Sequence, residues 1–305
     1  KKSSISIQLT PFPCVRPLLS SPSFTRKNIA PHLSIPYNKR TIQNKKHKGT
    51  VQKSTPGKDQ KPHYDTLYLS LYCRNRPILL IEWIIGKFSP ETKDISSLRI
   101  IQAVFRFILW ITGAKVTVIG EENVPKDTPV LYIGNHRSYF DILLTYSRCP
   151  IRTGYIAKKE MEKIPLLSTW MRYLHCLFLD RKDIKQGLKT ILTAVEKVKS
   201  GISICIFPEG TRNRNADETD MLPFHEGSFK IATKAKCPII PIAINNSADI
   251  FEAHFPKMSP AKVVVEYGKP IYPDELSKED KKHIGEYTQN IIREMLIKNK
   301  PLTEN

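Results

Sequence analysis

The sequence lacks the marks of several protein classes. Its six cysteines are widely scattered and form neither a C-x-x-C pair nor a zinc-ligand spacing, which argues against a disulfide scaffold or a zinc domain. Cys176, Cys205 and Cys237 lie in or beside apolar runs, where a reduced, buried thiol is the ordinary state. We therefore predict a reducing compartment. No apolar stretch approaches the ~18 uncharged residues of a simple membrane-spanning helix.

Acidic residues are scarce at the amino-terminal end. Residues 1–62 contain thirteen Lys or Arg and one acid, Asp59, which together supply +12 of the net charge of +19. The other residues carry 35 basic and 28 acidic side chains. Because most of the basicity lies in this leader, which contains no recognisable nucleic-acid-binding module, the charge does not indicate a nucleic-acid partner.

The leader also lacks a lasting helical or strand period. It is rich in Pro, Ser, Lys and Arg, so it cannot bury enough apolar surface to offset its ordering entropy, and we predict that it is disordered. Its composition resembles an organellar transit peptide. The alternatives are a tail without function, a segment that does not belong to the native protein, or translated sequence upstream of the true start.

Two apolar segments follow. Residues 67–88 are interrupted by Arg74, Arg76 and Glu82, and Pro77 would break or restart a helix there.

Residues 95–113 predict an amphipathic helix, which Ser96 or Ser97 would cap and Gly113 would end. Its predicted apolar face contains Ile101, Val104, Phe105, Ile108, Trp110 and Ile111. The opposite face carries Arg99, Gln102 and Arg106. The pattern fits an ordinary core-packing helix, which is the commoner case, and equally a helix lying in a membrane interface.

From residue 114 to residue 305, short apolar runs alternate with helical stretches. The alternation predicts an α/β domain with a central mixed sheet flanked by helices. Candidate strands are residues 116–119, 130–133, 154–157, 177–179, 202–207, 239–244 and 263–267. Candidate helices are residues 138–147, 166–173, 184–199, 228–236 and 277–298.

His136 and Asp141 follow the second predicted strand and form a candidate base with its orienting acid. On a regular helix a five-residue offset rotates side chains by about 140°, so they can meet only if His136 precedes the first turn. The predicted strand-to-helix junction provides that geometry. A lone H-x₄-D is far more often a surface pair that never meets, and a metal-ligand pair is a lesser alternative without further ligands.

The stretch from Phe207 to Arg214 closes another strand. Gly210 allows close approach of a ligand, Thr211 offers a hydroxyl, and Arg212 can bind an anion. A polar surface loop with solvated arginines explains this stretch equally well.

Lys158 and Arg181 each follow a predicted strand, as His136 and Glu209 do. Ligands of open α/β sheets gather at the carboxyl ends of strands, so we expect these four residues to converge on one crevice. A base beside several cations suggests activation of a hydroxyl group on a phosphate-bearing substrate.

The motifs N-H-R-S-Y-F-D, F-L-D-R, F-P-E-G-T-R and C-P-I-I-P-I-A-I occur in this order. Together they resemble the glycerolipid acyltransferases, most of all the bacterial type of 1-acyl-glycerol-3-phosphate acyltransferase. The resemblance covers roughly residues 77–298 and does not reach the leader. Four ordered blocks are far more specific than any one of them.

The resemblance implies that His136, oriented by Asp141, deprotonates the 2-hydroxyl of lysophosphatidate. The oxygen would attack the thioester of acyl-CoA or acyl carrier protein and give phosphatidate, with no acyl-enzyme, metal or cofactor. Backbone amides near Gly210 would stabilise the oxyanion.

On the acceptor side, the resemblance assigns the glycerol phosphate to Arg181 and to the loop of Glu209, Gly210, Thr211 and Arg212, with help from Lys158. His225 replaces a lysine that is usual in the family.

Residues 63–113 would be a membrane-associated helical unit at the cytoplasmic face, in contact with membrane lipids, and organellar import through the leader stays an open expectation. Alternatives are another lysophospholipid or glycerol-3-phosphate acyltransferase, or a catalytically silent membrane-surface binding protein.

Overall fold

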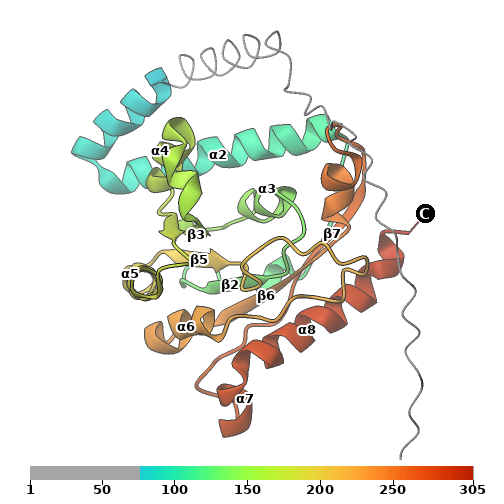
Figure 1. Cartoon of the computed structure of the whole chain (residues 1–305). Coiled ribbons are helices and arrows are strands. Elements are labelled where there is room, and N and C mark those ends of the chain that lie inside the picture. Colours follow the sequence, from blue (N-terminus) through green and yellow to red (C-terminus); the bar gives the residue numbers. More distant parts are fainter. Residues whose placement is uncertain (1–75, 305) are drawn as a thin grey trace, which may run out of the picture. The chain divides into compact units, whose positions relative to one another are not determined.

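Seven strands form one sheet in the computed structural model, which describes residues 76–304. Their order is β1-β7-β6-β2-β5-β3-β4. Helices cover both faces of this sheet (Figure 1). The predicted leader, residues 1–62, lies outside the described residues.

Each predicted strand is present, with ends that differ from the prediction by at most one residue. The strands are β1 (Lys115–Ile119), β2 (Leu131–Gly134), β3 (Thr153–Lys158), β4 (Leu177–Leu179), β5 (Ser203–Ile206), β6 (Ile239–Asn245) and β7 (Lys262–Tyr267). The fold class predicted from the sequence is confirmed.

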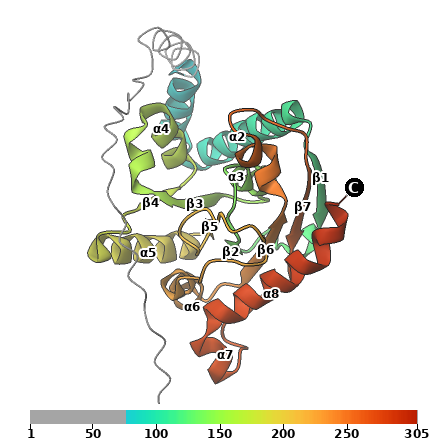
Figure 2. The ribbon, with the colours of Figure 1, turned by 45° about the vertical axis from the view of Figure 1, so that its right-hand side comes forward.

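The sheet is mixed because β1 and β7 run antiparallel to the other five strands. Strands β6, β2, β5, β3 and β4 pair in parallel, whereas β7 pairs antiparallel with β6 and parallel with β1. Figure 2 shows β7 between β6 and the edge strand β1. The five parallel strands therefore end at one common edge, where loops can meet.

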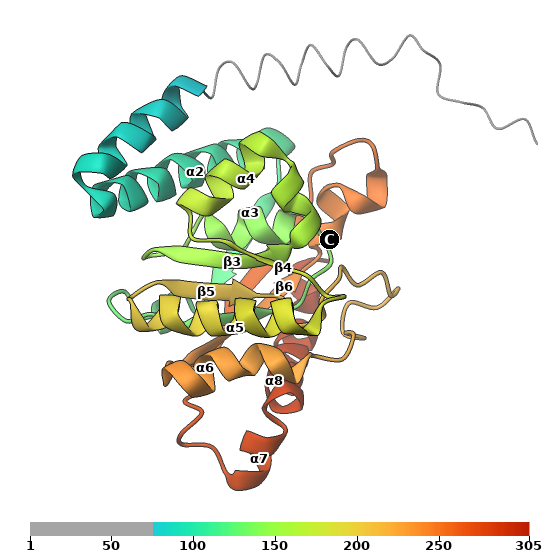
Figure 3. The same cartoon turned by 60° about the vertical axis from the view of Figure 1, so that its left-hand side comes forward.

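The helices form two layers, one on each face of the sheet (Figure 3). One layer holds α2 (Pro90–Thr112), α3 (Phe140–Tyr146) and α4 (Pro165–Tyr173). The other holds α5 (Ile184–Lys199), α6 (Lys230–Ala235) and α8 (Ile284–Asn299).

The single helix predicted over residues 277–298 is wrong in one respect. It is divided at His283 into α7 (Lys278–Lys282) and α8. The reason is burial: α7 has no buried residue, whereas α8 begins at the buried Ile284 and follows the sheet from there.

A hydrophobic core lies on each side of the sheet, as the strand period of two requires. Leu131 and Ile133 of β2 point into the core beneath α5, α6 and α8. Tyr132, between them, points into the core beneath α2 and α3.

Helix α2 begins earlier than predicted. Ser89 caps it by accepting from the Thr92 amide at 3.4 Å, and Pro90 occupies the first turn. Gly113 ends it with φ of +70°, as predicted. Ser96 and Ser97 are therefore inside the helix and do not cap it, which corrects the predicted start.

Ser96 and Ser97 have another role. Both donate to the carboxylate of Glu82, at 2.8–2.9 Å and 2.7 Å. Glu82 is buried and belongs to the helical residues 76–88 that precede α2. Because a buried carboxylate is costly unless it is paired, these bonds join the two helices.

The faces of α2 also differ from the prediction. Gln102, expected on the outer polar face, is buried and donates to the carbonyl oxygens of Tyr146 and Cys149, at 3.3 and 2.8 Å. On the predicted apolar face, Trp110 and Ile111 are exposed instead. By length and composition α2 is apolar enough to cross a membrane, the one such helix in the described part of the chain.

Candidate active site

His136 lies just beyond β2, in the loop that leads into α3. The preceding Asn135 anchors this loop, because its amide group donates to the Ile244 carbonyl and accepts from the Ile244 amide, both at 2.9 Å. The side chain of Asn135 thus continues the pairing of β2 with β6 after the strand has ended.

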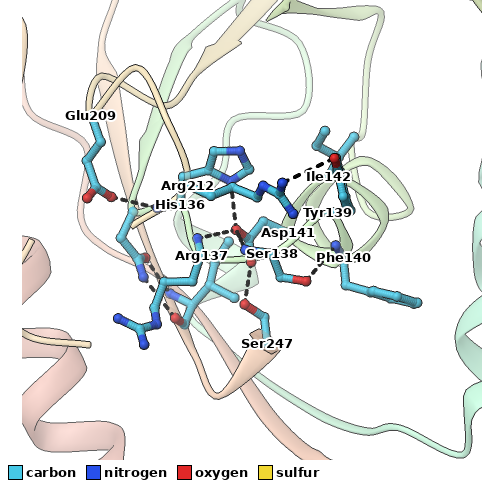
Figure 4. Close-up of polar contacts among 12 residues, drawn as sticks. His136, Arg137, Ser138, Tyr139, Phe140, Asp141, Ile142, Glu209, Arg212 and Ser247 are labelled. Atoms are coloured by element: carbon cyan, nitrogen blue, oxygen red, sulfur yellow. Dashed lines mark hydrogen bonds and ion pairs between the residues drawn. The ribbon is translucent and has the colours of Figure 1, made fainter. Parts of the chain in front are cut away.

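The predicted contact between His136 and Asp141 is present (Figure 4). His136 Nδ1 lies 2.8 Å from Asp141 Oδ2, and the same oxygen accepts from the amides of Arg137 and Ser138, both at 2.8 Å. Asp141 sits in the first turn of α3 and reaches back over the loop. The strand-to-helix junction supplies the geometry that a continuous helix could not.

Asp141 fixes the protonation pattern of the His136 ring. A carboxylate bound to two amides acts as an acceptor, so Nδ1 of His136 carries the proton and Nε2 is left as a proton acceptor. Nε2 makes no hydrogen bond within the described part of the chain, and the His136 side chain is 16% exposed. The ring can therefore meet a substrate hydroxyl.

Ser247 completes this arrangement and could not be predicted. Its hydroxyl donates to Asp141 Oδ1 at 2.5 Å, from a 3₁₀ turn, Ser247–Ile250, that follows β6 (Figure 4). The two residues are 106 positions apart, and no motif signals the contact.

Phe207 holds the ring of His136, and a hydrogen bond from Asn213 holds its backbone. The rings of His136 and Phe207 stack with centroids 4.4 Å apart. The His136 carbonyl accepts from the Asn213 amide at 2.7 Å. The loops after β2 and β5 therefore support one another.

Glu209 is the second bridge between these loops. It is buried, and its two oxygens accept from the His136 amide at 2.7 Å and the Leu222 amide at 2.9 Å. Burial raises the pKa of Glu209, and the two amide bonds oppose the rise. The structure shows the carboxylate holding the backbone; contact with substrate stays a prediction.

Gly210 lies close to two basic side chains. Its φ is +74°, a conformation that favours glycine, and a Cβ there would lie 3.2 Å from His225 Nε2 and 4.0 Å from Arg181 Nε. Arg181, which is exposed, and His225 thus flank the same backbone position.

The backbone amides of this loop differ in whether they already donate a hydrogen bond. The Gly210 amide donates to the Phe207 carbonyl at 3.0 Å, so it is not available for an oxyanion. The amides of Thr211 and Arg212 donate no hydrogen bond to any other residue that the structure describes.

Arg212 has protein partners. It donates to Glu252 at 2.9 Å and to the Tyr139 hydroxyl at 3.1 Å, and its guanidinium lies 3.7 Å from the Tyr139 ring centroid. Glu252 also accepts from the Ser138 hydroxyl at 2.6 Å. Glu252 could not be predicted from the H-x₄-D motif, because it lies over a hundred residues after it.

Lys158 is at the carboxyl end of β3, on the predicted edge. It is exposed and lies 3.6 Å from Glu160. The structure does not bring it into hydrogen-bond contact with the other described site residues.

The site offers no thiol nucleophile or metal-ligand cluster within residues 76–304. Cys205 is fully buried in β5, and burial raises its pKa well above the ordinary value, as its predicted core position implies. No group of three or more His, Cys, Asp or Glu side chains there could hold a metal ion.

Comparisons with known proteins show the family to which the chain is similar. A family model described as Acyltransferase matches residues 115–245. The 1-acyl-sn-glycerol-3-phosphate acyltransferase of Borreliella burgdorferi is 30% identical over 66% of this chain and 78% of its own. The Saccharomyces cerevisiae protein of that name is 32% identical over 60% of this chain and 59% of its own length.

A solved structure is similar as well. The 1-acyl-sn-glycerophosphate (LPA) acyltransferase PlsC of Thermotoga maritima matches with a TM-score of 0.60 and 25% identity, over 75% of this chain and 97% of that one. The resemblance carried by the four motifs is thereby confirmed. The chain belongs to the 1-acyl-sn-glycerol-3-phosphate acyltransferase family.

Proposed function

We propose that this enzyme transfers an acyl chain from a thioester to the 2-hydroxyl of 1-acyl-glycerol 3-phosphate and so forms phosphatidate. The observation that carries the proposal is the contact between His136 and the buried Asp141, which leaves Nε2 open to a hydroxyl. The names of the relatives support the same acceptor.

In this mechanism His136 acts as general base. Nε2 accepts the proton of the acceptor hydroxyl while its oxygen attacks the thioester carbonyl. Asp141 holds the ring and stabilises the imidazolium that forms. Collapse of the tetrahedral intermediate expels the thiolate, which recovers the proton, and no acyl-enzyme is required.

The residues around His136 would bind the acceptor phosphate and stabilise the oxyanion. Arg181 and His225, which both lie close to Gly210, would hold the acceptor phosphate, and Lys158 lies on the same sheet edge. The uncommitted amides of Thr211 and Arg212 would stabilise the oxyanion, in place of the Gly210 amide. Glu209 would contribute chiefly by fixing the loop.

Membrane association at the cytoplasmic face is part of the proposal. Val104, Phe107, Trp110 and Ile111 expose an apolar face on α2, and Trp83 is exposed on the helix before it. Such faces fit a helix lying in the interface, from which a lipid acceptor could enter. The donor is acyl-CoA or acyl carrier protein.

The proposal is tested by acyl transfer in detergent, with lysophosphatidate and glycerol 3-phosphate as competing acceptors. We expect wild type to form phosphatidate, and the His136→Ala variant to be slower by roughly 10²–10⁴-fold with an unchanged melting temperature. His283→Ala serves as the matched control, because His283 is half exposed and belongs to the junction of α7 and α8.

Three results would change the assignment. Retained turnover in a folded His136→Ala variant would show that His136 is not the general base. Preference for glycerol 3-phosphate would keep the mechanism and change the acceptor. A folded wild type that transfers to neither acceptor would favour a binding protein.

A further inference from the structure

A groove of about 540 Å³ lies between α2 and the carboxyl end of α3. Its volume is within the ~300–1,000 Å³ of ligand pockets. Apolar side chains, including Leu109, Leu144 and Val116, line part of it. It is distinct from the acyl-transfer site, because His136 precedes α3 whereas the groove lies beyond the other end of that helix.

The charges around the groove are mostly positive. The lining contains Arg99, Arg106, Lys126 and Arg148, against the single carboxylate of Glu121. Glu121 lies 3.3 Å from Arg148, which accounts for one cation. Among residues 76–304, three of the cations that line the groove therefore have no carboxylate partner.

These cations keep donors for a ligand. Arg99 donates to the Gln102 side chain at 3.1 Å, and Arg106 reaches the Ser147 carbonyl only at 3.5 Å. Lys126 makes no ion pair or hydrogen bond with another residue in the described part. A guanidinium has five donors, so each arginine can still bind phosphate oxygens.

The cationic groove adjoins the exposed apolar face of α2. Residues three and four apart share a helix face, so Arg99, Arg106 and Trp110 form one stripe with Ala103 between them. Trp110 is 75% exposed, and Phe107 next to the stripe is 58% exposed. Cations beside exposed aromatic groups match an amphiphile whose anionic head and apolar chains separate.

We propose that this groove binds the phosphate head group of an anionic phospholipid from the bilayer, while the acyl chains lie against Phe107 and Trp110. The charge complementarity selects the head group, and the adjoining apolar stripe selects a lipid over a soluble phosphate. This second lipid site requires no acyl transfer and would orient the enzyme on an anionic membrane.

The test uses the full chain carrying Trp83→Phe, so that Trp110 is the exposed tryptophan of the described residues, while Trp170 stays buried. Fluorescence is recorded on vesicles of one fixed phosphatidylcholine and phosphatidylglycerol composition, in which either the phosphatidylglycerol or an equal amount of the phosphatidylcholine is brominated. We expect stronger quenching by the anionic lipid. Each interfacial cation is worth about 1 kcal/mol, or roughly five-fold, so Arg99→Gln with Lys126→Gln should abolish the preference.

Lys185→Gln with Lys189→Gln is the charge-matched control on the exposed surface of α5, and it should keep the preference. Arg99→Lys with Lys126→Arg should also keep it. Equal quenching by the two lipids in wild type, or a preference that survives Arg99→Gln with Lys126→Gln, would overturn the site.

Two further measurements complete the test. Displacement of the lipid by millimolar inorganic phosphate would show a site for a free anion and would contradict the lipid proposal. Acyl transfer in neutral detergent, which should be the same for wild type and the Arg99/Lys126 variant, separates this proposal from the proposed reaction. A lowered rate would show that the groove serves catalysis instead.

Discussion

Asp141 is the residue on which the geometry of the site depends. A buried carboxylate is costly unless its oxygens are hydrogen-bonded, and here both oxygens are engaged. One oxygen binds His136 and two loop amides, and the other accepts from Ser247. The position of His136 is therefore determined jointly by its own loop and by the turn after β6.

His225 yields a prediction on the phosphate side. Its Nε2 and Arg181 Nε both lie close to the Cβ position at Gly210, where a permanent cation would strengthen phosphate binding. Imidazole groups lose their charge near neutral pH, whereas lysine keeps it. We expect His225→Lys to lower the KM for lysophosphatidate several-fold at pH 8, by roughly 1 kcal/mol, because lysine is a permanent cation there.

The measurement is KM at pH 8 for wild type and the lysine variant, with kcat followed in parallel. His254→Lys, an exposed histidine in the turn after Glu252, controls for the added charge. A KM that is equal in wild type and His225→Lys at pH 8 would show that His225 does not bind the phosphate.

Much of the site could be predicted at this scale, and the omissions have one cause. His136 and Asp141 are five positions apart, so their contact follows from a local junction. Ser247 and Glu252 meet the same loop from more than a hundred residues away. Nothing local indicates such a contact, because it depends on β6 pairing beside β2.

Among the elements, α2 is attached to the domain by partly buried polar groups. His175 Nε2 lies 2.7 Å from Asp94 of α2, and His175 Nδ1 lies 3.3 Å from Lys197 Nζ. An ammonium group can only donate, so Nδ1 accepts, and the proton is on Nε2 toward Asp94. The ring is therefore neutral in this arrangement.

This arrangement predicts a pH dependence. Burial lowers the pKa of His175, and Lys197 and Lys93 act in the same direction against Asp94, which raises it. Arg152 also faces Asp94, at 3.8 Å. Because the unfolded chain takes up the proton first, stability is present above the ordinary histidine pKa and is lost as pH falls below it.

We expect the free energy of unfolding to fall between pH 6.5 and pH 5, by at most about 1.4 kcal/mol per pH unit from this group. His175→Gln should reduce that slope, and His283→Gln, which changes an exposed histidine, should keep it. Chemical denaturation at several pH values measures both. If the pH dependence of the free energy of unfolding is unaltered in His175→Gln, a group other than His175 takes up the proton.

For the whole molecule, the position of the site predicts the effect of removing the leader. All described contacts of His136, Asp141 and Glu209 come from residues between 136 and 247. We therefore expect a chain without residues 1–62 to retain kcat within about two-fold when assayed in detergent, since no contact that directs catalysis is removed.

The assay compares the truncated and full chains at equal concentration, after a melting curve has shown that each is folded. A truncated chain that folds yet has lost its activity would show that the leader contributes to catalysis. Weaker vesicle binding with unchanged kcat would instead assign the +12 charge of the leader to membrane association.

The seven strands, most of the helices and the pairing of His136 with Asp141 could be predicted from the sequence, because periodicity and short spacings are local properties. Which side of α2 faces the domain depends instead on tertiary packing: the carbonyl groups at the end of α3 need partners, and Gln102 provides them. It also decided that Ser247 and Glu252 support the site, since only the order of the strands brings these distant residues together.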